Sequence, residues 1–240
     1  MEDSRRKPIL KVQRLVSGYN RVKIVNNINM HIGYGEIVSI IGRNGVGKST
    51  LTKTLIGICK TMQGSIEFDG RDVTDMKAYM RARLGMGYAP QGNRVYPGLS
   101  VEENLIVGMG VNIGEQNKSL DIAFTYFPRL FERRKQKAGS LSGGEQAMLT
   151  LGRALVGRPK LMLLDELSEG IQPNIIHLIG EIALKASKEL NMSILISEQH
   201  IGIIQQISNR AYAIDKGTIV GELTREELQE YNRVQQYLVV

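Results

Sequence analysis

The stretch of sequence that decides the fold is IVSIIGRNGVGKST, residues 37–50. Residues 37–41 are mostly apolar and end at a glycine, which predicts a buried strand. Residues 42–49 then fit the pattern GxxxxGK[ST] of a phosphate-binding loop. Glycines let consecutive backbone N–H groups turn inward around phosphate oxygens, and the helix predicted over residues 48–59 would direct its positive dipole end at them. The stretch therefore predicts a nucleotide phosphate site.

The end of this loop carries the side chains that such a site needs. Lys48 can reach the β- and γ-phosphates of a nucleotide, and the hydroxyl of Ser49 can ligate Mg²⁺. The sequence thus predicts ATP and Mg²⁺ as cofactors. The residues predicted to bind ATP here are Gly42, Arg43, Asn44, Gly45, Val46, Gly47, Lys48, Ser49 and Thr50.

A second apolar run, LMLLDE at residues 161–166, ends in two carboxylates. An acidic residue at the carboxyl end of a strand lies at the mouth of a parallel sheet, where ligands bind. Asp165 suits Mg²⁺, held directly or through water, and Glu166 could polarise an attacking water as a general base. Beside a phosphate-binding loop, this pair predicts the hydrolytic part of the site.

The rest of the chain alternates strand and helix patterns, which favours a largely parallel sheet with flanking helices. Helices are expected at residues 145–156, 173–190 and 201–208, and strands at 9–15, 27–32, 65–68, 161–164, 192–197, 211–214 and 218–220. Strand patterns vanish from residue 92 to 138, where Ser100 and Glu103 predict a capping box and residues 121–135 one or two helices interrupted at Pro128. This segment predicts a helical subdomain inserted into an α/β core.

Composition sets broad limits on the function. The chain has 240 residues, of which 42% are hydrophobic and 23% charged, as in an ordinary globular protein. A single cysteine, Cys59, excludes a disulfide within the chain and favours a reducing, cytosolic setting. We find neither a signal-peptide pattern nor an apolar run of the ~18 residues that a spanning helix needs. The net charge of +7 permits anionic partners without choosing one.

Residues 141–146, LSGGEQ, resemble the signature motif of ABC-type ATPases. They follow the phosphate-binding loop and precede the acidic strand, in the order of that family. The resemblance covers essentially the whole chain and implies a P-loop NTPase fold of the ABC ATPase type: a mixed α/β sheet core, an antiparallel β subdomain and an inserted helical subdomain. It implies a single domain, 1–240, with its core at 8–91 and 141–222, its helical subdomain at 92–140 and a C-terminal helical tail at 223–240.

The resemblance also implies a site shared between two chains. Two ATPase subunits would face head to tail, with ATP between the phosphate-binding loop of one and the signature of the other. The residues expected to contact the partner's ATP are Ser142, Gly143, Gly144, Glu145 and Gln146. Tyr19 stands where the family stacks an aromatic ring on adenine, and Gln91 stands where an amide contacts Mg²⁺ and the attacking water. The implied metal site is Ser49, Gln91 and Asp165, and the implied catalytic residues are Glu166, Gln91 and Gln199.

Three positions depart from the family pattern. Leu167 replaces a common proline, Gln172 replaces an aspartate, and Gln199 stands where most members carry a switch histidine. His200 follows one place later. If the preceding strand continues through these residues, their side chains point to opposite faces, so both cannot face the nucleotide. We expect Gln199 to face the γ-phosphate.

The glutamine at the switch, with residues 142–149 and 94–105, resembles the hydrophobic amino-acid uptake subfamily, and within it the second of two ATPase subunits. Residues 42–47 and 169–173 look similar to its urea and short-amide branch. The resemblance implies an ATPase at the cytoplasmic face of the membrane that powers an importer of branched-chain amino acids, urea or short-chain amides. It implies permease subunits, a second ATPase subunit (the same chain or a paralogue), an indirect solute-binding protein, and no nucleic acid as partner.

Two other functions remain as alternatives. One is the ATPase of a lipid or lipopolysaccharide-type exporter, which we expect to keep the switch histidine that Gln199 replaces. The other is a soluble ABC ATPase that acts on nucleic acid. Members of that class carry long coiled coils or zinc modules before the signature, whereas here Lys48 and Ser142 are only 94 residues apart (142 − 48), without heptads.

Overall fold

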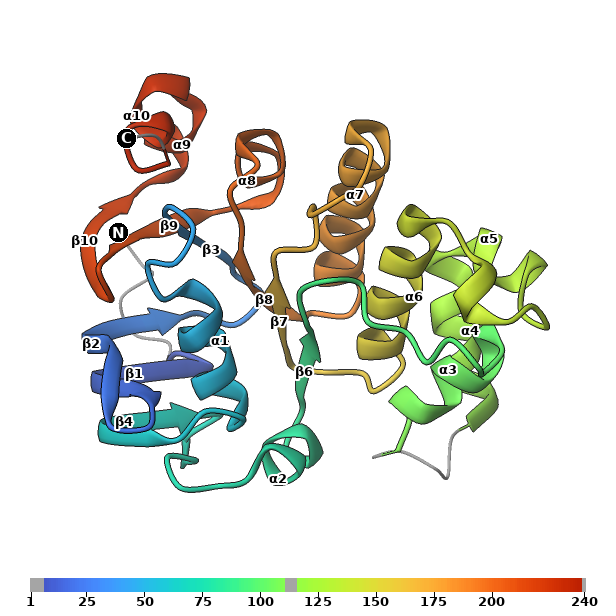
Figure 1. The fold of residues 1–240 in the computed structure, drawn as a ribbon, viewed down its shortest axis with the longest axis horizontal. Helices are drawn as coiled ribbons and strands as arrows, with labels where there is room; N and C mark the ends of the chain where they lie inside the picture. The colour runs from blue at the N-terminus through green and yellow to red at the C-terminus, as the bar shows by residue number, and fades with distance from the viewer. Residues whose placement is uncertain (1–6, 111–115, 239–240) are drawn as a thin grey trace.

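The structure is a computed structural model that describes residues 7–110 and 116–238. Its centre is a six-stranded sheet in the order β10-β9-β3-β8-β7-β6 (Figure 1). The strands from β9 to β6 pair in parallel, and β10 pairs antiparallel with β9 at one edge. The bounds are β3 (Ile37–Ile41), β6 (Met86–Ala89), β7 (Leu161–Asp165), β8 (Ser193–Ser197), β9 (Arg210–Asp215) and β10 (Thr218–Leu223). The predicted mixed, largely parallel sheet is confirmed.

The two faces of this sheet are covered by different layers. Along β7, Leu161 and Leu163 pack into the core shared with the second sheet, while Met162 and Leu164 pack into the core shared with the helices. Successive side chains of a strand point to opposite faces, which explains the alternation. Both faces are apolar because both are covered, so β3, β7 and β8 read as continuous apolar runs rather than as alternating ones.

The second sheet has four antiparallel strands in the order β2-β1-β4-β5. They are β1 (Leu10–Tyr19), β2 (Val22–Ile32), β4 (Thr61–Phe68) and β5 (Arg71–Asp72). Helix α1 (Lys48–Ile56) lies between the two sheets, where Leu51 and Leu55 are fully buried. Because α1 is held on both sides, its N-terminus has a fixed position at the carboxyl end of β3.

The remaining helices cover the other face and the ends of the sheet. Helices α3 (Val101–Gly108), α4 (Gln116–Tyr126) and α5 (Pro128–Glu132) and the 3₁₀ turn η2 (Ala138–Ser140) precede α6 (Gly143–Leu155) and α7 (Pro173–Glu189). In Figure 1, α3–α6 lie on the opposite side of β6–β8 from α1. Helix α8 (Ile201–Ile207) packs with α9 (Arg225–Gln229) and α10 (Tyr231–Gln235) near the C-terminus. No helix in the described ranges is both long and apolar enough to cross a bilayer.

Most expected elements are present, with a few differences. The capping box of Ser100 and Glu103 is confirmed at the start of α3. Helix α1 ends at Ile56 rather than at residue 59 because Gly57, with φ 86°, adopts the left-handed conformation that stops a helix. The elements that were missed include α2 (Ala78–Arg83) and β6. Both are short, and tertiary contacts hold them: Arg81 of α2 is buried and donates hydrogen bonds to four backbone carbonyls.

Candidate active site

The loop between β3 and α1 has the shape of an anion cradle. Gly42 has φ 152°, and a Cβ there would lie 2.4 Å from the carbonyl oxygen of Ile214. Gly47 has φ 111° and caps α1 without a side-chain hydrogen bond. A side chain at Gly42 would clash with the backbone and one at Gly47 would be strained, and the first N–H groups of α1 are left for a ligand.

The ammonium group of Lys48 lies inside this loop. Lys48 is 3% exposed, and its Nζ donates hydrogen bonds to the carbonyl oxygens of Gly42 (2.8 Å) and Arg43 (2.9 Å). The same Nζ lies 3.0 Å from Oε1 of Glu166, at the end of β7. The structure therefore joins the phosphate-binding loop and the acidic strand, which are more than a hundred residues apart in sequence, through one buried cation.

Asp165 is placed as a cation site requires. It is fully buried and lies on the same face of β7 as Leu161 and Leu163, toward α1. The hydroxyl of Tyr88 lies 3.4 Å from its Oδ2, and its Oδ1 has no partner among the described residues. The Ser49 hydroxyl is close enough to favour the charged form of the carboxyl and so acts to lower its pKa. Burial raises the pKa of Asp165, and the Glu166 carboxylate adds to this effect. A buried carboxylate with an unused oxygen beside a hydroxyl fits Mg²⁺, which keeps waters and phosphates as its other ligands.

No group of three or more His, Cys, Asp or Glu side chains in the described part of the chain could hold a metal ion on its own. The donor set at Ser49 and Asp165 fits a cation whose other ligands come from a nucleotide and from water.

Glu166 is the meeting point of the predicted catalytic residues. Its Oε2 accepts a hydrogen bond from Nε2 of Gln91 (2.8 Å), and its Oε1 accepts one from Nε2 of Gln199 (3.0 Å) and faces Lys48. Glu166 has φ 46°, an uncommon conformation for a residue with a side chain, and its N–H donates to Ser197 of β8. The turn out of β7 thereby directs the carboxylate toward the loop.

Gln199 and His200 occupy different places. The side chain of Gln199 donates to Glu166 and to Oδ1 of Asn44 in the phosphate-binding loop. His200 caps α8, and its Nδ1 is buried without a partner among the described residues. Strand alternation, from which we predicted that only one of these two side chains faces the site, is the wrong reason. Strand β8 ends at Ser197 and does not continue through Gln199 and His200. A short loop places Gln199 at the site.

The signature residues begin helix α6. Ser142 is its N-cap: its Oγ and its N–H each donate to Oε2 of Glu145, at 2.9 Å. Glu145 is 5% exposed, and its Oε1 lies 2.9 Å from Nε of both Arg129 and Arg133. These hydrogen bonds and cations outweigh the effect of burial and lower the pKa of Glu145. Two of the residues expected to contact ATP therefore have other contacts: Glu145 binds Ser142 and the two arginines, and Gln146 donates to backbone carbonyls nearby.

The signature and the phosphate-binding loop are separate in this chain. Among the residues that the structure describes, no hydrogen bond or ion pair joins residues 142–146 to residues 42–50, and α6 and α1 lie on opposite sides of β6–β8 (Figure 1). Ser142 and Gly143 are exposed. Tyr19, the residue expected at adenine, ends β1 with 46% of its surface exposed.

The family model described as ABC transporter matches residues 25–169. The chain belongs to the ABC transporter family. This ABC transporter ATPase is 37% identical over 213 residues to the high-affinity branched-chain amino acid transport ATP-binding protein BraG of Pseudomonas aeruginosa, covering 88% of this chain and 91% of the relative. It is 34% identical over 226 residues to the probable branched-chain amino acid transport ATP-binding protein LivF of Archaeoglobus fulgidus, covering 94% and 96%.

Another relative belongs to the lipopolysaccharide exporters, the class of the first alternative function. The lipopolysaccharide export system ATP-binding protein LptB of Haemophilus influenzae is 28% identical over 230 residues, covering 94% of this chain and 95% of the relative. Among solved structures, a nucleotide-free ATP-binding cassette of an ABC transporter matches with a TM-score of 0.84 and 25% identity, covering 98% of this chain and all of the other. The predicted ABC ATPase fold is confirmed, and the chain is an ATP-binding subunit of a transporter.

Some residues near the site were not expected from the sequence. Tyr88 approaches Asp165 from β6, a strand too short to be predicted. Nothing in the sequence around Arg133 indicates that it pairs with Glu145 in the signature. The capping-box spacing of Ser142 and Glu145 could have shown that Glu145 turns back on its own helix.

Proposed function

We propose that this chain hydrolyses ATP to power the import of branched-chain amino acids, urea or short-chain amides. Its similarity to BraG over 88% of the chain carries the proposal for the solute class. The Lys48–Glu166 contact, with Gln91 and Gln199 on the same carboxylate, supports the proposed chemistry. Bound ATP would supply the bond that is cleaved, with Mg²⁺ neutralising its phosphate charge.

The side chains have distinct proposed roles. Glu166 takes the proton of the attacking water as general base, and the amides of Gln91 and Gln199 orient its carboxylate. Lys48 and the N–H groups of residues 42–50 hold the phosphates, and Tyr19 stacks on adenine. Ser49, Asp165 and the side-chain carbonyl oxygen of Gln91 would hold Mg²⁺, which would offset the phosphate charge.

We propose that the site is completed by a second ATPase subunit, the same chain or a paralogue, facing head to tail. The exposure of Ser142 and Gly143, away from the phosphate-binding loop of their own chain, supports this. The ATPase activity of the isolated chain should then be weak and should fall per chain on dilution. A turnover per chain that stays constant down to nanomolar protein would argue for a self-contained site.

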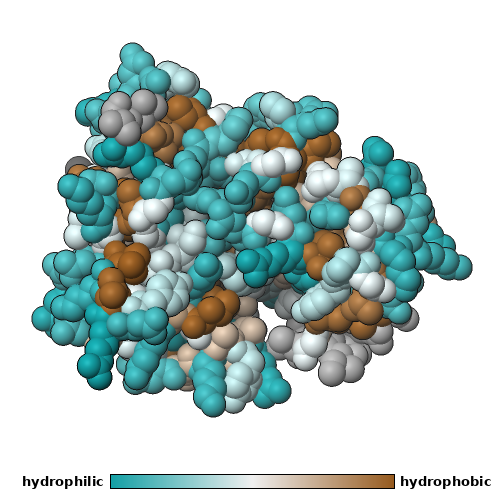
Figure 2. Space-filling view, viewed as in Figure 1, coloured by the Kyte–Doolittle hydropathy of each residue, from teal (hydrophilic) through white to brown (hydrophobic). Residues whose placement is uncertain are grey.

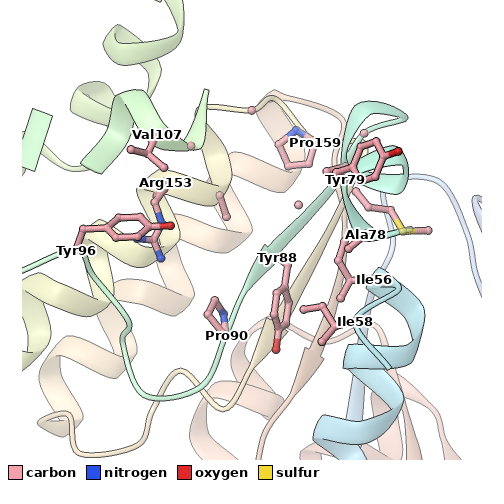
Figure 3. Close-up of a pocket in the computed structure, with 17 residues that line it drawn as sticks. Ile56, Ile58, Ala78, Tyr79, Tyr88, Pro90, Tyr96, Val107, Arg153 and Pro159 are labelled. Atoms are coloured by element: carbon pink, nitrogen blue, oxygen red, sulfur yellow. The ribbon is translucent and has the colours of Figure 1, made fainter. Parts of the chain in front are cut away.

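We propose that the chain divides into a core (8–91 and 141–222), a helical subdomain (92–140) and a tail (223–240). A groove is lined by residues of the core and of the helical subdomain. The groove has a volume of about 420 Å³, and its walls include Tyr79 of α2, Tyr88 of β6 and Val107 of α3 (Figure 3). Arg153 of α6 gives the groove a positive charge, and the guanidinium of Arg153 lies 5.0 Å from the ring of Tyr96. Figure 2 shows a mainly hydrophilic face with separate hydrophobic patches.

We propose that this groove receives a cytoplasmic segment of a permease subunit, with apolar side chains against Tyr79 and Val107 and an acceptor for Arg153. This contact would hold the chain at the cytoplasmic face of the membrane, and a solute-binding protein would act through the permeases. Val107 is 47% exposed, so Val107→Glu should fold and keep basal ATPase activity while losing its association with membranes. Val220→Glu, at a 52% exposed position outside the groove, is the matched control.

Uptake in cells tests the function as a whole. Deletion of the gene should reduce uptake of radiolabelled leucine, isoleucine and valine, or of urea and acetamide, and the wild-type gene should restore it while the Glu166→Gln variant does not. Normal uptake of all these solutes with altered lipopolysaccharide at the cell surface would contradict the proposal in favour of an exporter.

A further inference from the structure

Glu198 is a buried carboxylate that the proposed chemistry does not use. It lies between β8 and α8, one residue before Gln199, and is 1% exposed. Its Oε1 accepts three hydrogen bonds: from Oγ of Ser168 (2.6 Å), from the N–H of Gln199 (2.8 Å) and from the N–H of His200 (3.1 Å). A carboxylate is costly to bury, so a position that keeps one there needs a reason.

These three donors come from two loops that both end at the site. Ser168 follows Glu166 in the loop after β7, and Gln199 and His200 form the loop after β8. The strands are adjacent and parallel, with Asp165 paired to Ser197. Glu198 therefore joins the loop that carries Glu166 to the loop that carries Gln199.

The hydrogen bond from the N–H of Gln199 to Glu198 fixes the backbone from which the Gln199 side chain extends. The Gln199 amide reaches Oε1 of Glu166 at 3.0 Å, and its own N–H is held by Glu198. The backbone on either side is held elsewhere, since the N–H of Glu198 donates to Ile40 (3.2 Å) and the carbonyl oxygen of His200 accepts from Ile204 (3.3 Å). Between these two points, Glu198 Oε1 holds the N–H of Gln199 itself. Small displacements of a group that orients a catalytic carboxylate are expensive in rate.

We propose that Glu198 is a positioning residue for ATP hydrolysis, whose Oε1 aligns the loops after β7 and β8 so that Gln199 meets Glu166. The inference rests on the proposed role of Gln199 at the site. Glu198 acts as a hydrogen-bond acceptor and not through its charge, because all three donors converge on one oxygen and Oε2 has no partner among the described residues.

Because Glu198 acts as an acceptor, Glu198→Gln and Glu198→Ala should have different effects. In Glu198→Gln the amide oxygen can accept the same three hydrogen bonds, whereas Glu198→Ala removes the acceptor. Glu198→Ala should lower kcat by about three- to tenfold, the effect of one misplaced hydrogen bond, with an unchanged Kd for ATP. Glu198→Gln should restore kcat to within about twofold of wild type.

Hydrogen–deuterium exchange of the protein without nucleotide gives a readout that does not depend on ATPase activity. The amides of Gln199 and His200 should exchange faster in Glu198→Ala and stay protected in Glu198→Gln. Ser187→Ala is the matched control, because Ser187 is 3% exposed and donates to the carbonyl oxygen of Met192 (2.6 Å) at the far end of β8. It should lower the melting temperature without changing kcat or the exchange of these two amides.

A double variant identifies the route of the effect. If Glu198 acts through Gln199, adding Glu198→Ala to Gln199→Ala should lower kcat no further. An additive loss, an inactive Glu198→Gln that folds, or unchanged amide exchange in Glu198→Ala would overturn the proposal. A normal kcat in Gln199→Ala with faster exchange in Glu198→Ala would instead contradict the proposed role of Gln199 and leave the anchoring contact in place.

Discussion

Replacing Lys48 by methionine should nearly abolish ATP binding while leaving the fold intact. The ammonium group is buried and bonded to two loop carbonyls and to Glu166, so it is already held where phosphates would lie. Charge-assisted hydrogen bonds contribute about 1.5–3 kcal/mol each. Loss of two such bonds to phosphate oxygens costs about 3–6 kcal/mol, which weakens binding by roughly 10² to 10⁴-fold.

Thermal unfolding with and without MgATP measures this effect. At a ligand concentration of ~1,000 Kd, binding stabilises the wild type by about 4 kcal/mol, a shift of roughly 8–16 °C for a domain of this size. Under the same conditions Lys48→Met should shift by less than about 6 °C. Lys185→Met, at an exposed position on α7, should behave like wild type. A full MgATP shift in Lys48→Met would refute the assignment of residues 42–50 as the phosphate-binding loop.

Three further predictions follow from particular contacts. His200→Ala should leave ATPase activity nearly unchanged, whereas Gln199→Ala should lower kcat by about three- to tenfold, since only Gln199 contacts Glu166; the reverse ranking would make His200 the switch. Arg81→Met should lower the free energy of unfolding by about 3–5 kcal/mol, because it removes four hydrogen bonds to backbone carbonyls, two of them fully buried, and urea titration against the exposed Arg83→Met measures this; equal curves would contradict it. The lowered pKa of Glu145 means that its contribution to stability is present above its ordinary pKa of 4.5 and is lost as pH falls through the lower value in the folded state. Urea unfolding at a series of pH values below 4.5 should therefore show a weaker pH dependence for Glu145→Gln than for wild type, and identical slopes would show that Glu145 does not respond to pH in this way.

The sequence predicts much of this site because the chemistry sits in local patterns. The glycines of residues 42–47 and the carboxylates after residues 161–164 carry their own strand and turn signals, so their meeting at one sheet edge follows from parallel pairing. The capping boxes at Ser100 and Ser142 are likewise local patterns. The first was predicted from its spacing, and the second has the same spacing and could have been predicted in the same way.

Contacts that depend on tertiary packing were not predictable in this way. The burial of Arg81 requires the C-terminus of α1 and the loop before α2 to converge, and nothing in its neighbours indicates that. In the sequence, Glu198 is simply a charged residue that follows a strand. Its hydrogen bond with Ser168 depends on the pairing of β7 with β8, which the local sequence does not indicate. Gln199 lies against Glu166, but the loop after β8, and not the strand alternation from which its direction was predicted, sets that direction.

The central claim is that Glu166 is the general base of an ATP-hydrolysing site, and Glu166→Gln tests it most directly. Glutamine keeps the shape, and its carbonyl oxygen can still accept from Gln199 and face Lys48, as Oε1 of Glu166 does. Its amide nitrogen stands where Oε2 accepts from Gln91, and it cannot take a proton from water. We expect phosphate release from bound ATP to slow by roughly 10² to 10⁴-fold while the Kd for MgATP stays close to wild type, so that an ATP-bound dimer accumulates in gel filtration. Wild-type turnover in this variant, with normal ATP binding, would contradict the account.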